Sequence, residues 1–285
     1  VEQNPNELRS NTLEVLASFI AAGVDYKKQI IFQQSSVAEH SQLAWVFNCV
    51  SRIGWLNRMT QFKDKAGKNK ENVSVGLMVY PNLMAADILA YLATHVPVGD
   101  DQKQHLELCR DIATKFNNDY DNNYFILPEP IIPKFVSRVM SLRDGTKKMS
   151  KSDESDLSRI NLTDTKDQII QKIKKAKTDN DPIDEKIFDE KSKRYEAQNL
   201  IKIYSNLNSE TPDKVLNNFN GKTFSDFKKY LSDLLIEKIS PISEEIKKYR
   251  SDDKELINLL TIGSEKANNN AEKTMLEIKK IVGLV

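Results

Sequence analysis

The chain has 285 residues, of which 39% are hydrophobic and 29% charged, and its 42 basic and 41 acidic residues leave a net charge of +1. This balance excludes a globally basic nucleic-acid coat, so any RNA binding has to use a local patch. The two cysteines, Cys49 and Cys109, form no Cys-x-x-Cys pair, which argues against a disulfide framework or a zinc site. No apolar run reaches the roughly 18 residues of a membrane span, and no signal peptide opens the chain. We therefore expect a cytoplasmic protein without membrane association.

The first half of the chain alternates predicted helices and short strands. Asn4 is a cap residue followed by Pro5 at the first helical position, and Gly23 ends that helix. The next elements, in chain order, are a strand at 29–34, helices at 43–58 and 82–92, a short buried strand at 95–99 and a helix from 100 to about 116. This alternation is typical of an α/β sheet with crossover connections.

Strand signals fade after residue 164, and amphipathic helices take over. They are predicted at 165–177, 197–206, 224–239, 242–249, 253–260 and 264–282. We place the boundary between a first, α/β domain of residues 1–155 and a second, all-helical domain of residues 156–285. The last helix is expected to pack back on the first domain.

One polar string, Lys148-Met149-Ser150-Lys151-Ser152, follows a turn at Asp144-Gly145-Thr146. Its two lysines, three residues apart, can aim at one multivalent anion, and the nearby hydroxyls can hold the loop or donate to phosphate. The other interpretation is a solvated basic loop. The string resembles the KMSKS loop of class I aminoacyl-tRNA synthetases, which closes over ATP and neutralises the departing pyrophosphate.

A second string, Val96 to Gln102, joins the predicted strand at 95–99 to the helix after it. In open α/β sheets, ligands sit at the carboxyl ends of the strands, where a helix N-terminus offers N–H groups and partial positive charge. Gly99 lets a ligand approach the backbone, and Gln102 supplies a donor and an acceptor. Asp100 and Asp101 can alternatively be plain helix caps.

Asp87 is an acid inside an otherwise apolar helix. A buried carboxylate is costly unless something donates to it, so it requires either a structural partner or a ligand N–H. Tyr80 and Met84, four residues apart, can share a face and line an aromatic-sized pocket, or belong to the core. The segment from Met59 to Lys65 holds two lysines around an acid, which can cover a polyphosphate or form an ordinary surface loop.

Together these strings resemble bacterial-type tryptophanyl-tRNA synthetases, and the similarity covers nearly the whole chain. It also includes the early strings Asn4 to Arg9 and Gln33 to His40. Tyrosyl-tRNA synthetases, the nearest relatives, share a Gly-x-Asp-Gln turn. The string from Met84 to Leu89 and the pair His105-x-Glu107 favour the tryptophan enzymes.

The resemblance implies a Rossmann-like catalytic domain and an anticodon-binding helical domain. It implies ATP and Mg²⁺ as cofactors, L-tryptophan and tRNA(Trp) as partners, a homodimer, and no side-chain metal site. The implied catalytic residues are Lys148, Lys151 and Lys65. The implied tryptophan-binding residues are Asp87, which accepts the indole N–H, with Tyr80, Met84, Val96, Val98 and Gln102. The implied ATP-binding residues are Lys148, Met149, Ser150, Lys151, Ser152, Gly99, Asp100, Asp101 and Lys65.

The chain departs from this pattern because it contains no His-Ile-Gly-His-like signature, which the family uses to bind ATP. We expect that signature and its flanking strands to precede Val1. Two other functions stay open: a truncated, non-catalytic module that binds tryptophan or RNA, and a tyrosyl-tRNA synthetase-like enzyme. The helix at 43–58, with Trp45 and Trp55, is a candidate dimer interface or core. Candidate tRNA-phosphate contacts, or a solvated helix face, are Lys172, Lys174, Lys175 and Lys177.

Overall fold

The computed structural model describes residues 4–60, 62–63, 72–99, 102–132, 138–151, 153–189 and 191–285. They form two compact units, and each unit is built from two separate stretches of chain. The carboxylate unit, named for Asp87, comprises residues 26–133 and 257–285. The lysine-loop unit comprises residues 1–25 and 134–256. No helix among the described residues is both long and apolar enough to cross a membrane.

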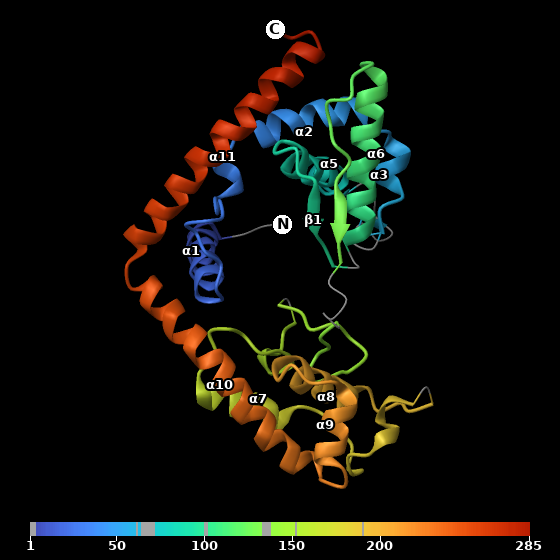
Figure 1. The fold of residues 1–285 in the computed structure, drawn as a ribbon, viewed down its shortest axis with the longest axis vertical. Coiled ribbons are helices and arrows are strands. Elements are labelled where there is room, and N and C mark those ends of the chain that lie inside the picture. The colour runs from blue at the N-terminus through green and yellow to red at the C-terminus, as the bar shows by residue number, and fades with distance from the viewer. Residues whose placement is uncertain are drawn as a thin grey trace. The chain divides into compact units, whose positions relative to one another are not determined.

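The carboxylate unit contains a parallel pair of strands, β1 (His95–Pro97) and β2 (Glu129–Ile131), joined through helix α6 (Lys103–Asp119) (Figure 1). Val96 pairs with Pro130 in this register. The strands, helices and crossover confirm the predicted α/β class. The strand β2 was not predicted, because Pro128, Pro130 and Pro133 weaken the strand signal of its sequence.

Helices α2 (Glu39–Val50), α3 (Ile53–Asn57) and α5 (Val75–Leu89) cover this pair of strands together with α6. The predicted helix at 43–58 is therefore two helices, separated at Ser51, whose backbone is extended and whose hydroxyl donates to Asn82 Oδ1 at 2.9 Å. Phe47, Phe116 and Phe125 pack edge to face in the core. Ala267, Ala271 and Ile278 of α11 (Asp253–Ile281) belong to the same core.

The predicted strand at 29–34 is wrong. Residues 30–33 have no regular structure, and the short 3-10 helix η1 (Gln34–Ser36) follows them. The segment packs on α11 instead of pairing with a strand, since a Cβ added at Gly263 would lie 1.8 Å from the Ile31 carbonyl oxygen. The close approach of two backbones at this point requires glycine.

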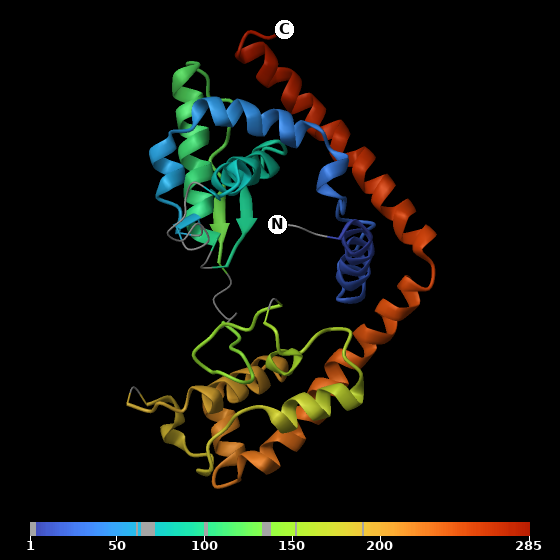
Figure 2. The same cartoon turned by 180° about the vertical axis from the view of Figure 1, so that it is seen from behind.

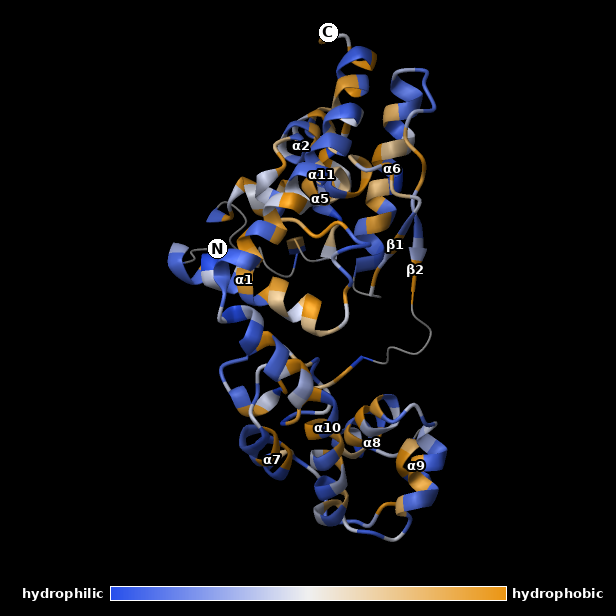
Figure 3. Ribbon diagram, turned by 60° about the vertical axis from the view of Figure 1, so that its left-hand side comes forward, coloured by the Kyte–Doolittle hydropathy of each residue, from blue (hydrophilic) through white to orange (hydrophobic). Residues whose placement is uncertain are grey.

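The lysine-loop unit is helical, as Figures 1 and 2 show. Its helices are α1 (Pro5–Ala21), η4 (Asp156–Ser158), α7 (Lys166–Lys175), η5 (Glu185–Phe188), α8 (Tyr195–Leu207), α9 (Pro212–Phe219) and α10 (Phe224–Arg250). The Asn4 side chain caps α1, as predicted, and Thr165 forms a capping box with Gln168 at α7. Helices α8 and α10 carry both hydrophobic and hydrophilic residues along their length (Figure 3).

Three helix predictions in this half need correction. Helix α10 is continuous where 224–239 and 242–249 were predicted, because Pro241 lies on an exposed face where water can satisfy the carbonyl that loses its donor. Helix α11 likewise runs through the predicted break at Gly263. Helix α9 was not predicted.

The boundary between compact units does not coincide with the predicted domain boundary at 155/156. Leu142, which precedes the lysine string, packs in one core with Ile169 and Ile173 of α7, and it therefore belongs with the helices that follow. The compact units divide at 25/26, 133/134 and 256/257, and the last of these divisions lies inside α11. The assignment of a function to each predicted domain stays a prediction.

The predicted basic face of α7 is wrong for one residue, Lys172. Its side chain is only 3% exposed, and its Nζ lies 2.7 Å from both Asp164 Oδ2 and Asp156 Oδ2. Asp164 is buried as well, at 4%. Lys172 therefore cannot contact tRNA phosphates in this structure, whereas Lys174, Lys175 and Lys177 are exposed.

Lys172→Ala is expected to lower the free energy of unfolding by about 3–5 kcal/mol, because Asp164 would remain buried without its cation. Urea denaturation followed by circular dichroism measures this change. The matched control is Lys174→Ala on the same helix, where a change within about 0.5 kcal/mol is expected for an exposed side chain. Equal losses in the two variants would contradict the assigned role of the buried pair.

Candidate functional site

Helix α5 presents Tyr80, Met84 and Asp87 on one face, because residues four and seven apart lie on the same side of a helix. Ser74 caps the helix by accepting from the Leu77 N–H. Met84 is half-buried and packs against the core, and the carboxyl of Asp87 is 33% exposed. Tyr80 and Met84 therefore share a face, as their spacing predicted, and Asp87 lies on the same face.

Asp87 has one full hydrogen bond among the described residues. Gln34 Nε2 donates to Asp87 Oδ2 at 2.7 Å. His40 Nδ1 lies 3.1 Å from Asp87 Oδ1, which is within ion-pair distance, but the approach lacks the geometry of a hydrogen bond. Asp87 Oδ1 is thus a buried acceptor without a hydrogen bond in the described part of the chain. His40 covers this oxygen, but the carboxyl as a whole is 33% exposed, so a ligand N–H can still reach Asp87.

His40 links Asp87 to Tyr91. The ring of His40 is 3% exposed, and its Nε2 lies 2.7 Å from the Tyr91 hydroxyl. Burial lowers the pKa of His40, and the charge of Asp87 opposes this. Burial also raises the pKa of Asp87, against the opposing effects of the Gln34 hydrogen bond and of His40. Burial, with nearby Asp87 and Glu39, raises the pKa of Tyr91 to about 12.

A second tyrosine–histidine pair lies at the other end of this face. The Tyr80 hydroxyl is 2.7 Å from Nε2 of His105, which is 2% exposed and belongs to α6. Burial raises the pKa of Tyr80. The pair joins α5 to α6, so it holds the Tyr80 ring against the helix that follows β1.

The carboxyl end of β1 supplies the remaining predicted side chains of the carboxylate unit. Val98 is buried, and Val96 is half-buried against the same core as Met84. Gly99 is exposed, and its carbonyl accepts from the Gln102 N–H at 3.0 Å, where α6 begins. Asp100 and Asp101 lie outside the described residues.

Gln34, His40 and Tyr91 were not predicted as site residues. Tyr91 follows Asp87 by four residues, a spacing that could have indicated it. Gln34 and His40 come from a segment more than forty residues earlier, and only the packing of η1 and α2 on α5 brings them to Asp87.

The lysine string continues a hairpin in the lysine-loop unit. Met140 and Lys148 form an antiparallel bridge, flanked by hydrogen bonds from Ser141 N to Lys147 O and from Met149 N to Val139 O. Asp144 Oδ1 accepts from the backbone and hydroxyl of Thr146 and so closes the turn. Lys148 and Lys151 are exposed, Ser150 is half-buried, and Met149 packs against the helical core. Ser152 and Lys65 lie outside the described residues.

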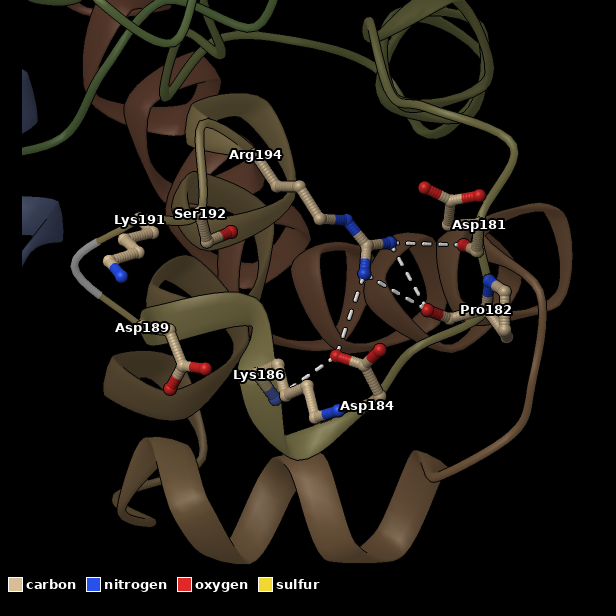
Figure 4. A pocket seen from close by; sticks show the side chains of 8 residues that line it. All are labelled: Asp181, Pro182, Asp184, Lys186, Asp189, Lys191, Ser192 and Arg194. Carbon is tan, nitrogen blue, oxygen red and sulfur yellow. Dashed lines mark hydrogen bonds and ion pairs between the residues drawn. The ribbon is translucent and has the colours of Figure 1, made fainter.

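A hollow of about 430 Å³ lies in the lysine-loop unit, between residues 181 and 194 (Figure 4). Arg194 points into it but is already engaged, because its guanidinium makes two hydrogen bonds to Asp179 and further ones to the carbonyls of Asp181 and Pro182. The pKa of Asp179 is lowered by this partner, although burial acts in the opposite direction. We interpret these contacts as structural, because Arg194 holds the loop of residues 179–182 in place. No predicted site residue lies there.

Comparison with known proteins adds independent information. The model of the family "tRNA synthetases class I (W and Y)" matches residues 2–239. The tryptophan–tRNA ligase of Brucella melitensis is 53% identical over 99% of this chain and 85% of its own length. That of Caulobacter vibrioides is 53% identical over 99% and 82%.

Solved structures agree with these sequence matches. The chain superposes on tryptophanyl-tRNA synthetase from Mycoplasma pneumoniae with a TM-score of 0.86 and 32% identity, over 100% of this chain and 85% of that one. The enzyme from Campylobacter jejuni, solved with ADP and tryptophan, gives a TM-score of 0.80 and 30% identity, over 99% and 85%.

Proposed function

Because the chain belongs to the class I tRNA synthetases for tryptophan and tyrosine, we propose that it activates L-tryptophan with ATP and transfers it to tRNA(Trp). The observation that carries the choice of substrate is Asp87, an acid on the otherwise apolar face of α5 whose carboxyl is 33% exposed and can be reached by a ligand donor. An indole N–H is a matching donor. A phenol hydroxyl is another, but relatives that are 48–53% identical bear the name of the tryptophan enzyme.

In this proposal the side chains around Asp87 form the amino-acid pocket. Asp87 accepts the indole N–H while Gln34 keeps the other carboxylate oxygen in place. Tyr80, Met84, Val96 and Val98 provide the apolar lining, and Gln102 helps to hold the ammonium group. A site built around such a hydrogen bond rejects analogues that lack the donor, since it leaves its own acceptor unpaired.

The lysine hairpin supplies the charge for the chemical step. The tryptophan carboxylate attacks the α-phosphorus of ATP, and the bond from that phosphorus to the bridging oxygen breaks, so the electron pair leaves with pyrophosphate. Lys148 and Lys151 stabilise the charge that develops on the leaving group, and no protein nucleophile is needed. Lys65, Gly99, Asp100, Asp101, Met149, Ser150 and Ser152 complete the proposed ATP site.

The described residues contain no group of three histidine, cysteine or acidic side chains that could hold a metal ion. Mg²⁺ usually binds through substrate phosphates, water and one or two carboxylates, so a protein cage is not required. Bound together with ATP, Mg²⁺ would supply positive charge at the phosphates. Binding and orientation of the substrates are the work of the chain's own residues.

The proposed partners follow the same reasoning. Of the two tryptophans proposed for a dimer interface, Trp45 is 70% exposed, as is Ile53 beside them at 69%, and both support the proposed homodimer. Trp55 packs against the core of its own unit instead. The helices after residue 155, with Lys174, Lys175 and Lys177 on an exposed face, support tRNA binding. A reaction that consumes ATP and tRNA fits the cytoplasmic location expected from the sequence.

Two assays on the complete gene product test the proposal. Equilibrium titration without ATP should show saturable binding of tryptophan and rejection of tyrosine, and ATP–pyrophosphate exchange should depend on tryptophan. Binding of tyrosine would overturn the substrate assignment. Tryptophan binding without exchange would identify the non-catalytic alternative, and absence of both would refute the proposal.

Tryptophan affinity is expected to fall as the solution becomes acidic. The midpoint of this fall should lie above pH 3.8, the ordinary pKa of aspartate, because burial raises the pKa of Asp87. The ionised carboxylate is the strong acceptor, so binding is present above the pKa of the folded protein and lost as the pH falls through it. Titrations between pH 4 and 8 measure the effect. Asp87→Asn, which has no charge to lose, should give weaker binding that does not change over this range, and an identical pH profile in both proteins would contradict the assignment.

A further inference from the structure

Asn199, a residue of α8, forms hydrogen bonds with the backbone of the lysine hairpin at Met140. The side chain is 3% exposed, and its amide bonds to both backbone groups of one residue. Met140 N donates to Asn199 Oδ1 at 2.9 Å, and Asn199 Nδ2 donates to Met140 O at 2.8 Å. A side-chain amide that pairs with one residue in both directions acts like a further strand at the edge of the hairpin.

Met140 is the bridge partner of Lys148, which makes this contact relevant to the chemistry. The hydrogen bonds of the bridge run from Ser141 to Lys147 and from Met149 to Val139. They leave the N–H and C=O of Met140 directed away from the Lys148 strand, as expected for the pair that exchanges no hydrogen bonds between strands. Asn199 satisfies both of these groups.

The rest of the hairpin is also tied to neighbouring helices. Leu142 N donates to Ser158 O at 2.9 Å, and Lys177 N donates to Leu142 O at 2.8 Å. The turn lies directly on the first turn of α8, since a Cβ added at Gly145 would be 2.5 Å from the Glu196 nitrogen. The first strand and the turn of the hairpin are therefore fixed at several points. The second strand carries the exposed Lys148, and Lys151 follows it.

We infer that Asn199 is a positioning residue, which sets the place of Lys148 through Met140 and so controls the rate of adenylate formation without contacting substrate. This inference rests on the proposed function. Loss of the amide leaves two backbone groups of the half-buried Met140 without partners, so the first strand of the hairpin has to shift to find others. A displacement of about 1 Å at a catalytic group can cost about 100-fold in rate.

The test compares Asn199→Ala with Ser205→Ala in the complete gene product. Ser205 is a matched control on the same helix, since it is also 3% exposed and also donates to a backbone carbonyl, that of Glu210, away from the hairpin. Single-turnover adenylate formation is measured per tryptophan-binding site, beside tryptophan affinity without ATP. We expect Asn199→Ala to be about 10- to 100-fold slower with unchanged tryptophan affinity, and Ser205→Ala to keep the wild-type rate.

A wild-type rate per site in Asn199→Ala, equal slowing in Ser205→Ala, or a parallel loss of tryptophan affinity would overturn the inference. If Asn199→Ala does not fold, Asn199→Asp serves as the test variant. Aspartate has the same shape as asparagine and keeps the acceptor for Met140 N, but it lacks the donor to Met140 O. A slower rate with unchanged affinity supports the inference, and a wild-type rate overturns it. Failure of the proposed function is distinct, because the wild-type protein would then form no adenylate.

Discussion

Lys148→Ala and Lys151→Ala are each expected to slow tryptophanyl-adenylate formation by about 100- to 1,000-fold, the range found when one preorganised charge-stabilising donor is removed. Both side chains are exposed, Lys148 on the second strand of the hairpin and Lys151 just after it. In the proposed function their charges stabilise the leaving pyrophosphate. Single-turnover kinetics with saturating ATP and tryptophan measures the change, and tryptophan affinity without ATP should stay at the wild-type value.

The same hairpin offers a matched control. Lys147 is 77% exposed, and its Nζ lies 3.4 Å from Asp144 on the near side of the turn. It precedes the KMSKS-like string, so Lys147→Ala should retain the wild-type rate within about fivefold, because an exposed ion pair is worth less than about 1 kcal/mol. Unchanged rates in both Lys148→Ala and Lys151→Ala would refute the role of the hairpin in catalysis.

Asp87→Ala is expected to weaken tryptophan binding by about 10- to 150-fold, because a hydrogen bond to a charged group contributes about 1.5–3 kcal/mol. ATP binding should change little, since Asp87 faces the amino-acid pocket in the proposed site. Calorimetric titration with tryptophan and, separately, with ATP measures the two affinities. Equal losses of both would indicate that Asp87 holds the fold through Gln34 and His40 instead of binding the substrate.

A substrate analogue sharpens this test. An amino acid with a benzothiophene ring has sulfur in place of the indole N–H and nearly the same shape, so wild-type protein should bind it more weakly than tryptophan. Asp87→Ala should bind the two almost equally. Asp111→Ala, an exposed acid on α6 of the same unit, should behave like the wild type toward both ligands. Retained discrimination in Asp87→Ala would contradict the proposed hydrogen bond.

The local signals in the sequence were sufficient for much of the fold. Capping by Asn4, and the apolar spacing of α1, α6, α7 and α8, predicted these helices with boundaries close to those observed. The run from His95 predicted β1, although the strand ends at Pro97 and both His95 and Pro97 are exposed where a buried strand was expected. The four-residue spacing of Tyr80 and Met84 predicted that they share a face of α5. Each of these depends on residues within a few turns of one another, where side-chain spacing and hydrogen bonding to the backbone dominate.

The lysine string was identified from sequence for the same reason, since two cations and two hydroxyls in five residues need no distant partner to indicate an anion. Its support was not visible in the sequence. Asn199 reaches Met140 from a helix more than fifty residues later, and the compact unit that contains both is built from two separate stretches of chain.

Only the tertiary structure decided the conformation and burial of residues at which long-range packing outweighs local preference. Ile31 lies in a strand-like apolar run, yet its backbone packs on Gly263 of α11, so no strand forms. Lys172 has the spacing of an exposed basic face, but its side chain is buried and forms ion pairs with Asp164 and Asp156. His40 became a neighbour of Asp87 only through the packing of α2 on α5. The sequence by itself determined which residues are able to carry the chemistry, because chemical type and local spacing are written in it. Which of them meet, and which are buried, depended on contacts between segments far apart in the chain.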